Sequence, residues 1–188
     1  MTSGFAVWLT GLPCSGKTTL AEALQKELEY RGLSPRILDG DVLRRSLSAD
    51  LGYSPGDRRI HVRRVIKMAE NLVRSGTPVI AALISPQRAQ REEAKFRIRP
   101  LVEVYVRCPL EVCESRDVKG LYRRARKAEI KDFTGVSSPY EEPRHPDVTV
   151  DTDRMSVLSA LGRILDFLEV SGLLAESGWL VDRKKRTG

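Results

Sequence analysis

The chain has 188 residues, of which 41% are hydrophobic, and a formal net charge of +7. This length and composition suit one compact domain over residues 1–188 and exclude a disordered chain. No apolar run approaches the roughly 20 residues that cross a membrane, and no basic-then-apolar leader precedes the first expected strand. We therefore expect a soluble, cytoplasmic protein with no membrane partner.

Lysine and arginine outnumber aspartate and glutamate, 32 against 25. The basic residues crowd between Arg44 and Arg74 and between Arg116 and Lys131. Such a balance serves either nucleic acid or small, multiply charged anions. Aromatic residues are only 6%, and no RNA-binding pattern of interleaved aromatic and basic residues occurs. We expect anionic nucleotides as ligands and no nucleic acid. Binding of nucleic acid is the alternative.

The three cysteines are Cys14, Cys108 and Cys113. Their odd number and scattered spacing indicate neither a metal site nor a disulfide framework. Cys14 falls in the first motif below, where we expect that any small residue would serve; the alternative is an exposed thiol that oxidises.

The first expected strand, Phe5–Thr10, leads into Gly11–Thr18, which matches GxxxxGK[ST], and a helical pattern follows over Thr18–Leu28. This is the context of a phosphate-binding loop, whose inward N–H groups and helix dipole attract a polyphosphate. Lys17 can reach the β- and γ-phosphates, and the Thr18 hydroxyl can bind Mg²⁺. The residues expected to bind ATP here are Gly11, Leu12, Pro13, Cys14, Ser15, Gly16, Lys17, Thr18 and Thr19.

Apolar runs and helical patterns then alternate along the chain. The further expected strands are Arg36–Asp39, Val79–Ile84, Leu101–Val106 and Val148–Val150. The further expected helices are Val42–Leu47, Arg58–Arg74, one opened by Pro86, Pro109–Arg116 and Met155–Leu168. This alternation predicts an α/β fold like the three-layer fold of P-loop NTPases, with a mostly parallel five-stranded sheet and helices on both faces. The charged tail Arg183–Arg186 is expected to be solvated.

Three polar segments directly follow expected strands: Gly11–Thr18, Asp39–Asp41 and Ser85. Ligands bind outside the carboxyl ends of parallel strands, so these segments should converge. The guanine-reading NKxD segment of switch GTPases is absent, and Ser85 stands where many ATPases carry an acidic residue. Asp39 and Asp41 therefore supply the carboxylates, one to accept a proton from an attacking hydroxyl and one to orient the acceptor. The alternative is an acidic turn that only caps the next helix.

Four arginines, Arg44, Arg58, Arg63 and Arg64, follow the carboxylate pair on expected helical segments. Guanidinium groups bind phosphate and sulfate oxygens in a bidentate manner. As a group they indicate an acceptor that is itself a polyanion. The alternative for each arginine is a solvated helix face.

Several further segments accompany these residues in order along the chain. They are Gly11–Thr19, Leu38–Asp41 with Arg44, Leu51–Ser54, Arg63–Arg64, Ile84–Pro86 with Arg88, Pro109–Val112, Arg116–Asp117, Lys119–Tyr122, Ala125–Arg126, Ile130–Gly135 and Pro139–Glu141. Together they resemble the adenylylsulfate kinase (APS kinase) family. The phosphate loop is generic, but the DGD, KGLY and FTG…PYE segments in combination are specific to that family.

The resemblance implies that ATP donates its γ-phosphoryl group to the 3′-hydroxyl of adenosine 5′-phosphosulfate (APS), giving 3′-phosphoadenosine 5′-phosphosulfate (PAPS) and ADP. Asp41 would be the general base, with Lys17 and Ser85 also catalytic and Mg²⁺ bound by Thr18 and Asp41. The residues that it assigns to APS are Asp39, Asp41, Arg44, Tyr53, Arg58, His61, Ile84, Ser85, Lys131 and Phe133. Tyr53 and Phe133 would sandwich the adenine of APS.

The resemblance also assigns Arg116 and Lys119 to ATP and implies a basic lid over about residues 117–146. It implies a homodimer and a functional link to ATP sulfurylase. The family assigns a phosphorylated intermediate to the serine at Ser85, but direct in-line transfer needs none, and a serine there can instead position the acceptor.

Three positions depart from the family pattern. His61 stands where asparagine is usual; if it protonates, APS affinity should rise below about pH 6.5. Val118 replaces a usual proline, and Gln87 replaces a usual aromatic residue or histidine. The alternative functions are a related small-molecule kinase with another anionic acceptor, and a nucleotide-binding regulatory or nucleic-acid-binding module.

Overall fold

The computed structural model describes residues 4–175, so the expected charged tail at Arg183–Arg186 lies outside the described residues. The strands are β1 (Ala6–Thr10), β2 (Arg36–Asp39), β3 (Val79–Ala82), β4 (Leu101–Arg107) and β5 (Val148–Asp151). The helices are α1 (Lys17–Tyr30), α2 (Gly40–Arg45), α3 (Pro55–Arg74), α4 (Arg88–Arg97), α5 (Leu110–Arg116), α6 (Leu121–Arg126) and α7 (Val157–Val170). All five strands expected from the sequence are present.

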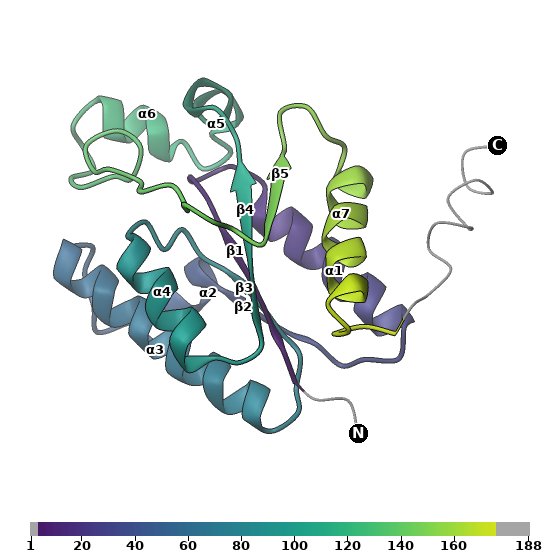
Figure 1. Ribbon diagram of the computed structural model, residues 1–188. Coiled ribbons are helices and arrows are strands. Elements are labelled where there is room, and N and C mark those ends of the chain that lie inside the picture. The colour runs from purple at the N-terminus through teal and green to yellow at the C-terminus, as the bar shows by residue number, and fades with distance from the viewer. Residues whose placement is uncertain (1–3, 176–188) are drawn as a thin grey trace.

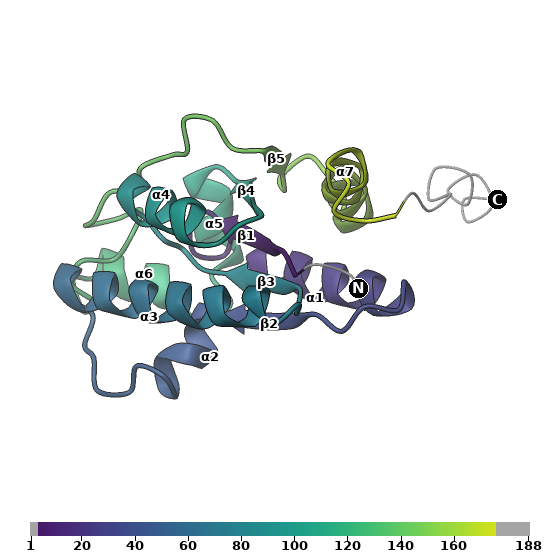
Figure 2. The ribbon, with the colours of Figure 1, turned by 60° about the horizontal axis from the view of Figure 1, so that its bottom comes forward.

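The strands form one sheet in the order β2-β3-β1-β4-β5, and every neighbouring pair is parallel. Helices α1 and α7 cover one face, and α3 and α4 cover the other (Figures 1 and 2). The predicted three-layer α/β fold is therefore confirmed. Because all strands run in the same direction, the loops after β1, β2 and β3 leave the sheet at a common edge.

The central strand β1 is buried along its whole length. Val7 and Leu9 point into the core formed with α1 and α7, whereas Ala6 and Trp8 point into the core formed with α3 and α4. A strand buried on both faces reads as a continuous apolar run, and each such large side chain contributes roughly 1.5–3 kcal/mol by burial. The phosphate loop thus extends from a firmly anchored strand.

Several element boundaries differ from the predicted ones by a few residues, as at β3 and α3. β3 ends at Ala82 instead of Ile84, and Ser85 further on adopts a φ of 37°, outside the extended region. α3 begins at Pro55 instead of Arg58, because the Ser54 side chain accepts a hydrogen bond from the Asp57 N–H at 3.1 Å. An N-capping serine followed by proline starts a helix well.

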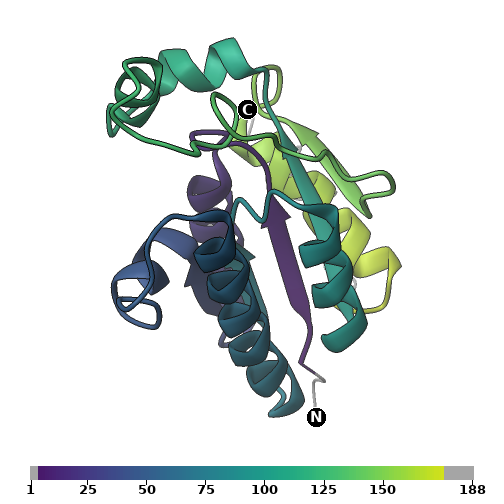
Figure 3. The same ribbon diagram turned by 90° about the vertical axis from the view of Figure 1, so that its left-hand side faces the viewer.

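The segment after α5 crosses the carboxyl edge of the sheet (Figure 3). It contains the six-residue helix α6, which was not predicted because a single basic turn has no apolar periodicity. The Asp117 carboxylate accepts hydrogen bonds from the N–H groups of Tyr122 and Arg123, both at 3.0 Å, and so starts this helix. Tyr122 packs edge-on against Phe133, with ring centroids 5.0 Å apart. Within residues 4–175, no helix is both long and apolar enough to cross a membrane.

Candidate active site

The loop Gly11–Thr18 wraps the carboxyl end of β1. A Cβ at Gly11 would lie 2.3 Å from the Val106 carbonyl oxygen, so only glycine allows this approach. Gly16, at the N-cap of α1, has a φ of 98°, again a glycine conformation. Cys14 also has a positive φ, 59°. The loop therefore has the backbone geometry expected of a phosphate cradle.

Lys17 lies at the centre of this loop and is buried. Its ammonium donates hydrogen bonds to the carbonyl oxygens of Gly11 and Leu12, at 2.9 and 2.6 Å. Burial lowers the pKa of Lys17 to about 8, while the Asp41 and Asp39 carboxylates act in the opposite direction. The amine is thus held inside the loop by hydrogen bonds to the backbone of the loop itself.

The Thr18 hydroxyl joins the phosphate loop to the segment after β2. It donates a hydrogen bond to Asp39 Oδ2 at 2.8 Å. The other carboxylate oxygen, Oδ1, accepts from the N–H groups of Asp41 and Val42, at 2.9 and 3.1 Å. Asp39 therefore caps α2, as expected if the acidic turn caps the next helix. It also contacts the phosphate loop, so capping is not its only role.

Asp41 lies two residues further on and is exposed to solvent. Its carboxylate forms an ion pair with the Lys119 ammonium at 2.5 Å, and this partner raises the pKa of Lys119. Lys119 belongs to the expected lid. One side chain expected at ATP thus contacts the carboxylate expected to act as base, although the two lie 78 residues apart in the sequence.

Arg116 reaches the phosphate loop from the end of α5. Its guanidinium donates to the Thr152 carbonyl at 2.7 Å and to the Cys14 carbonyl at 3.5 Å. The Thr152 hydroxyl donates in turn to the Ser15 carbonyl at 2.8 Å. Thr152 was not expected at the site, because it follows β5, 137 residues after its partner.

Ser85 is buried directly beside the base of the phosphate loop. Its hydroxyl accepts a hydrogen bond from Trp8 Nε1 at 3.0 Å and donates one to Thr10 Oγ1 at 3.3 Å. Only 2% of the side chain surface is exposed, so in this arrangement the hydroxyl is committed to protein partners. The segments after β1, β2 and β3 converge, as the topology predicted.

The expected acceptor residues lie around Tyr53 and Phe133. The Arg44 guanidinium lies 5.0 Å from the centre of the exposed Tyr53 ring. Arg58 donates to the Tyr53 carbonyl and to the Thr134 hydroxyl, both at 3.0 Å, and so holds the segments of Tyr53 and Phe133 beside each other. Phe133 itself is buried against Tyr122, whereas Tyr53 is open to solvent.

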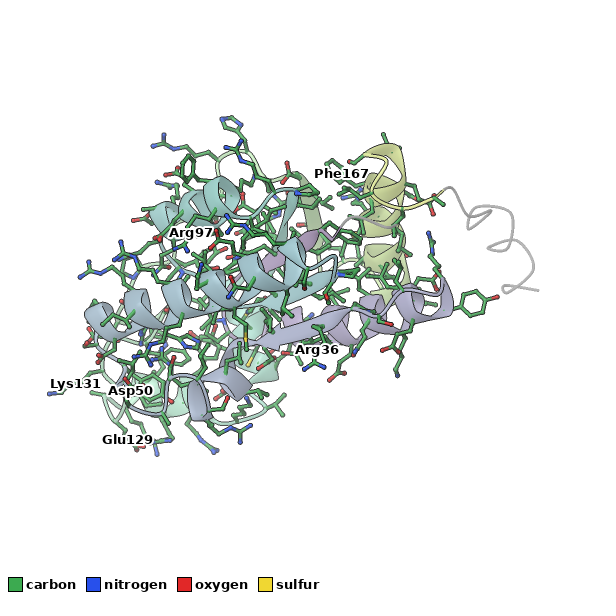
Figure 4. The ribbon with its side chains drawn as sticks, turned by 90° about the horizontal axis from the view of Figure 1, so that it is seen from below. Arg36, Asp50, Arg97, Glu129, Lys131 and Phe167 are labelled. Atoms are coloured by element: carbon green, nitrogen blue, oxygen red, sulfur yellow. The ribbon has the colours of Figure 1, made fainter. Side chains whose placement is uncertain are left out.

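The remaining residues that were expected to bind the acceptor have other partners or surroundings. Arg63 pairs with Glu93 and Arg64 with Asp50, so protein carboxylates already occupy both guanidinium groups. Lys131 is exposed and projects away from the ribbon at the end of the molecule where Asp50 also lies (Figure 4). Ile84 presents its carbonyl oxygen to the Thr10 hydroxyl at 2.7 Å.

The condition set for His61, that its ring protonates near pH 6.5, is not met. The side chain is buried, and its Nδ1 lies 2.9 Å from the Ser48 hydroxyl. Burial and the nearby charges of Arg44 and Arg64 lower its pKa to about 4, against a weaker opposing effect of a hydrogen bond with the Gly40 backbone. The ring therefore stays neutral between pH 5.5 and 8. Burial of this helix position could not be read from its basic surroundings in the sequence.

A cleft of about 790 Å³ opens beside Leu12, between the ends of β4 and β5 and the segment Gly135–Tyr140. Of the residues expected to bind ATP or APS, Leu12 alone lines it. The expected catalytic residues instead lie at the ends of β1, β2 and β3, where Asp41 is exposed and Lys17 and Ser85 are buried.

Comparison with known proteins agrees with this geometry. A family model described as adenylylsulphate kinase matches residues 3–151. The adenylyl-sulfate kinase of Paraburkholderia xenovorans is 48% identical over 90% of this chain and 95% of its own length, and that of Thermodesulfovibrio yellowstonii is 45% identical over 88% and 84%.

Solved structures extend the agreement to three dimensions. The Mycobacterium tuberculosis APS kinase CysC, solved in complex with AMPPNP and APS, superposes with a TM-score of 0.85 at 40% identity, over 90% of this chain and 99% of that one. Shikimate kinase from Aquifex aeolicus, at 18% identity and a TM-score of 0.53, shares the fold only. By its match to the family model and its similarity to these relatives, this chain belongs to the adenylylsulfate kinase family.

Proposed function

We propose that this protein transfers the γ-phosphoryl group of ATP to the 3′-hydroxyl of APS, forming PAPS and ADP. The hydrogen bond between Thr18 and Asp39 carries the proposal, because it joins the ATP-binding loop to the carboxylate turn of the acceptor side. The family membership supplies the identity of the acceptor, and the APS complex of the tuberculosis relative supports it.

The roles of the donor-side residues follow from phosphoryl-transfer chemistry. The N–H groups of the loop and the Lys17 ammonium hold the β- and γ-phosphates and stabilise charge on the transferred group. Arg116, which contacts the loop through Cys14 and Thr152, lies where it can bind the donor nucleotide. ATP is thereby positioned with its γ-phosphate toward the carboxylate turn.

The acceptor-side residues orient and activate the attacking hydroxyl. Asp41 accepts the proton of the 3′-hydroxyl, and its exposure supports access by a substrate. Arg44 and Arg58 bind the phosphosulfate oxygens. Tyr53 stacks on the adenine, with Phe133 on the opposite side. Asp39 keeps the turn in place through its three hydrogen bonds.

The oxygen atoms of Thr18 and its neighbours suit a magnesium ion that arrives with ATP. In the described part of the chain, no three histidine, cysteine or acidic residues form a metal cluster. Mg²⁺ usually keeps several waters and is bound by substrate phosphates with one or two protein oxygens. Thr18 and Asp41 would provide such oxygens, and Asp39 adds another beside Thr18. When bound, the ion neutralises charge on the β- and γ-phosphates.

Transfer is direct in this proposal, and Ser85 positions the acceptor. Its hydroxyl is buried and shared between Trp8 and Thr10, which favours a fixed structural role over attack on phosphorus. In-line transfer from ATP to a hydroxyl requires no phosphorylated enzyme.

Residues 117–146 act as a lid within a single kinase domain. Tyr122 anchors its start by donating a hydrogen bond to the Pro13 carbonyl at 3.0 Å, and Lys119 contacts Asp41. Closure excludes water, which would otherwise accept the phosphoryl group. The exposed Val118, at the entry to the lid, leaves this point without the rigidity of proline.

A homodimer, a cytoplasmic location and a link to ATP sulfurylase remain predictions from the family.

Coupled ADP release tests this function. The assay compares APS with other nucleosides, with sugars and with RNA, each in the presence of MgATP. We expect strong stimulation by APS alone, and PAPS as the product. Stimulation by another small acceptor instead would identify a related kinase, and stimulation by RNA would identify a nucleic-acid-dependent enzyme; either result overturns the proposal.

A further inference from the structure

Arg91, on α4, connects strand β4, the turn after β3 and the segment that precedes β5. Its side chain is 3% exposed. Nε donates to Glu103 Oε1 at 2.9 Å, Nη1 to the Ser85 carbonyl at 2.6 Å, and Nη2 to the Glu141 carbonyl at 2.5 Å. A planar guanidinium can serve acceptors in several fixed directions, which no other side chain can do.

The contact with Ser85 restrains a strained residue. Ser85 has a φ of 37°, a region that residues other than glycine rarely adopt and that persists only where neighbours enforce it. Arg91 holds the Ser85 carbonyl, while Trp8 and Thr10 hold its hydroxyl. Arg91 thus fixes the backbone of this turn, and Trp8 and Thr10 fix its side chain. The turn carries Ile84 and Ser85, which are expected to contact the acceptor.

Arg91 also orders the closing end of the lid. Its Cζ lies 5.5 Å from the centre of the Tyr140 ring, and the next residue, Glu141, accepts the Nη2 hydrogen bond. The Glu141 N–H donates to the Pro86 carbonyl at 2.8 Å, and its carboxylate accepts from the Arg88 N–H at 2.9 Å. The lid thus ends on the turn that follows β3.

Tyr140 carries this connection to the base of the phosphate loop. Its hydroxyl lies 2.9 Å from Thr10 Oγ1. The single hydroxyl proton of Thr10 goes to the Ile84 carbonyl at 2.7 Å, so both Tyr140 and Ser85 must donate to Thr10. The direction of every hydrogen bond around Thr10 is therefore determined.

The charge on Arg91 is balanced within the core. Glu103 is 6% exposed and pairs with Lys95 at 3.1 Å as well as with Arg91. A buried ion pair contributes little net stability compared with apolar packing, so its value here lies in the fixed geometry. Among the described residues, the hydrogen bonds of Arg91 reach no part of Gly11–Thr18.

We propose that Arg91 is a positioning residue of the acceptor site: it holds the Ser85 turn and the lid end Tyr140–Glu141 in the arrangement that receives APS. The inference rests on the proposed function. It assigns to Arg91 an effect on the acceptor nucleotide that is larger than its effect on ATP, exerted through the protein groups that Arg91 holds.

Steady-state kinetics of Arg91→Lys test the proposal. Lysine keeps a positive charge near Glu103 but cannot reach three acceptors in fixed directions. We expect the KM for APS to rise about tenfold and kcat to fall, because charge-assisted hydrogen bonds are lost, while the KM for ATP stays within about twofold.

Arg97→Lys is the matched control. Arg97 lies on the same helix (Figure 4) and pairs with Glu70 at 2.7 Å and with Glu93 at 3.7 Å, away from the Ser85 turn. Both Michaelis constants should be unchanged in this variant. Equal changes in the two constants of Arg91→Lys, or no change in either, would overturn the proposal.

Tyr140→Phe provides a second test that does not depend on how well Arg91→Lys folds. It removes only the hydroxyl that reaches Thr10, and we expect weaker APS binding to the enzyme–ADP complex by calorimetry, with ADP binding and the thermal midpoint unchanged. Unchanged APS binding contradicts the proposal. If the wild-type protein releases no ADP with APS, the proposed function itself fails. If the wild-type protein responds to APS but the variants behave like it, only the role of Arg91 fails.

Discussion

The donor and acceptor halves of the site are built in different ways. The phosphate loop consists mainly of backbone, with glycines at Gly11 and Gly16 and a buried lysine hydrogen-bonded to its own loop. The acceptor side consists of side chains, several of them paired with residues far away in the sequence, such as Asp41 with Lys119. The first half follows from eight consecutive residues, whereas the second exists only in the folded chain.

This difference predicts how each half fails. A change in the loop should impair every use of ATP, whatever the acceptor. A change on the acceptor side should leave nucleotide binding intact and impair transfer. The predictions below test that separation.

Asp41→Asn should have the largest effect. An amide cannot accept the proton of the attacking hydroxyl, so we expect kcat to fall by about 10²–10⁴-fold, the usual contribution of a general base. ADP binding, measured by calorimetry, should stay within about twofold. Asp166→Asn, which makes the same change on α7, should keep full turnover. Near-normal turnover of Asp41→Asn would mean that another group removes the proton.

Lys17→Ala tests the donor half. Loss of the ammonium removes a charge that stabilises the transferred phosphoryl group, and we expect kcat/KM for ATP to fall by about 10²–10³-fold. Unlike Asp41→Asn, this variant should also bind ADP more weakly. Lys26→Ala, at an exposed position of α1, should match the wild type. Intact ADP binding in Lys17→Ala would show that the two halves are not separable in this way.

The same difference explains what could be predicted from the sequence. The order and type of the strands followed from apolar runs bounded by turns, and the phosphate loop followed from its spacing. The convergence of Gly11–Thr18, Asp39–Asp41 and Ser85 followed from parallel topology alone.

Residues that reach the site through long-range contacts could not be found in this way. Thr152 and Tyr140 contact Ser15 and Thr10 across 137 and 130 residues, and neither stands in a local pattern that indicates such a contact. Arg91 is one of several charged residues of α4, and nothing in the sequence distinguishes it from the others. The sequence likewise left the charge of His61 open, because burial depends on what packs against a helix face.

Ser85→Ala separates positioning from covalent catalysis. We expect turnover to stay within about tenfold of the wild type, because direct transfer needs no hydroxyl at this position. Stability should fall by about 1–3 kcal/mol in denaturant titrations, since Trp8 Nε1 loses its buried partner. Incubation with γ-labelled ATP should leave no label on wild-type protein after denaturation. A labelled wild type together with an inactive variant would establish a phosphoserine intermediate.

His61→Asn should have the smallest effect on activity and a pH-dependent effect on stability. The folded-state pKa of His61 is about 4, below the usual 6.5, so between these values the unfolded chain binds the proton and the folded chain does not. Stability should therefore decrease as the pH falls from 6.5 toward 4, by about 2 kcal/mol at pH 4.5 from this residue. His61→Asn lacks this contribution, whereas His145→Asn, at an exposed position, should follow the wild type. Because the ring is neutral from pH 5.5 to 8, the KM for APS should show the same pH profile in His61→Asn and wild type. If the KM falls below pH 6.5 in the wild type but not in His61→Asn, His61 is charged in the acceptor site.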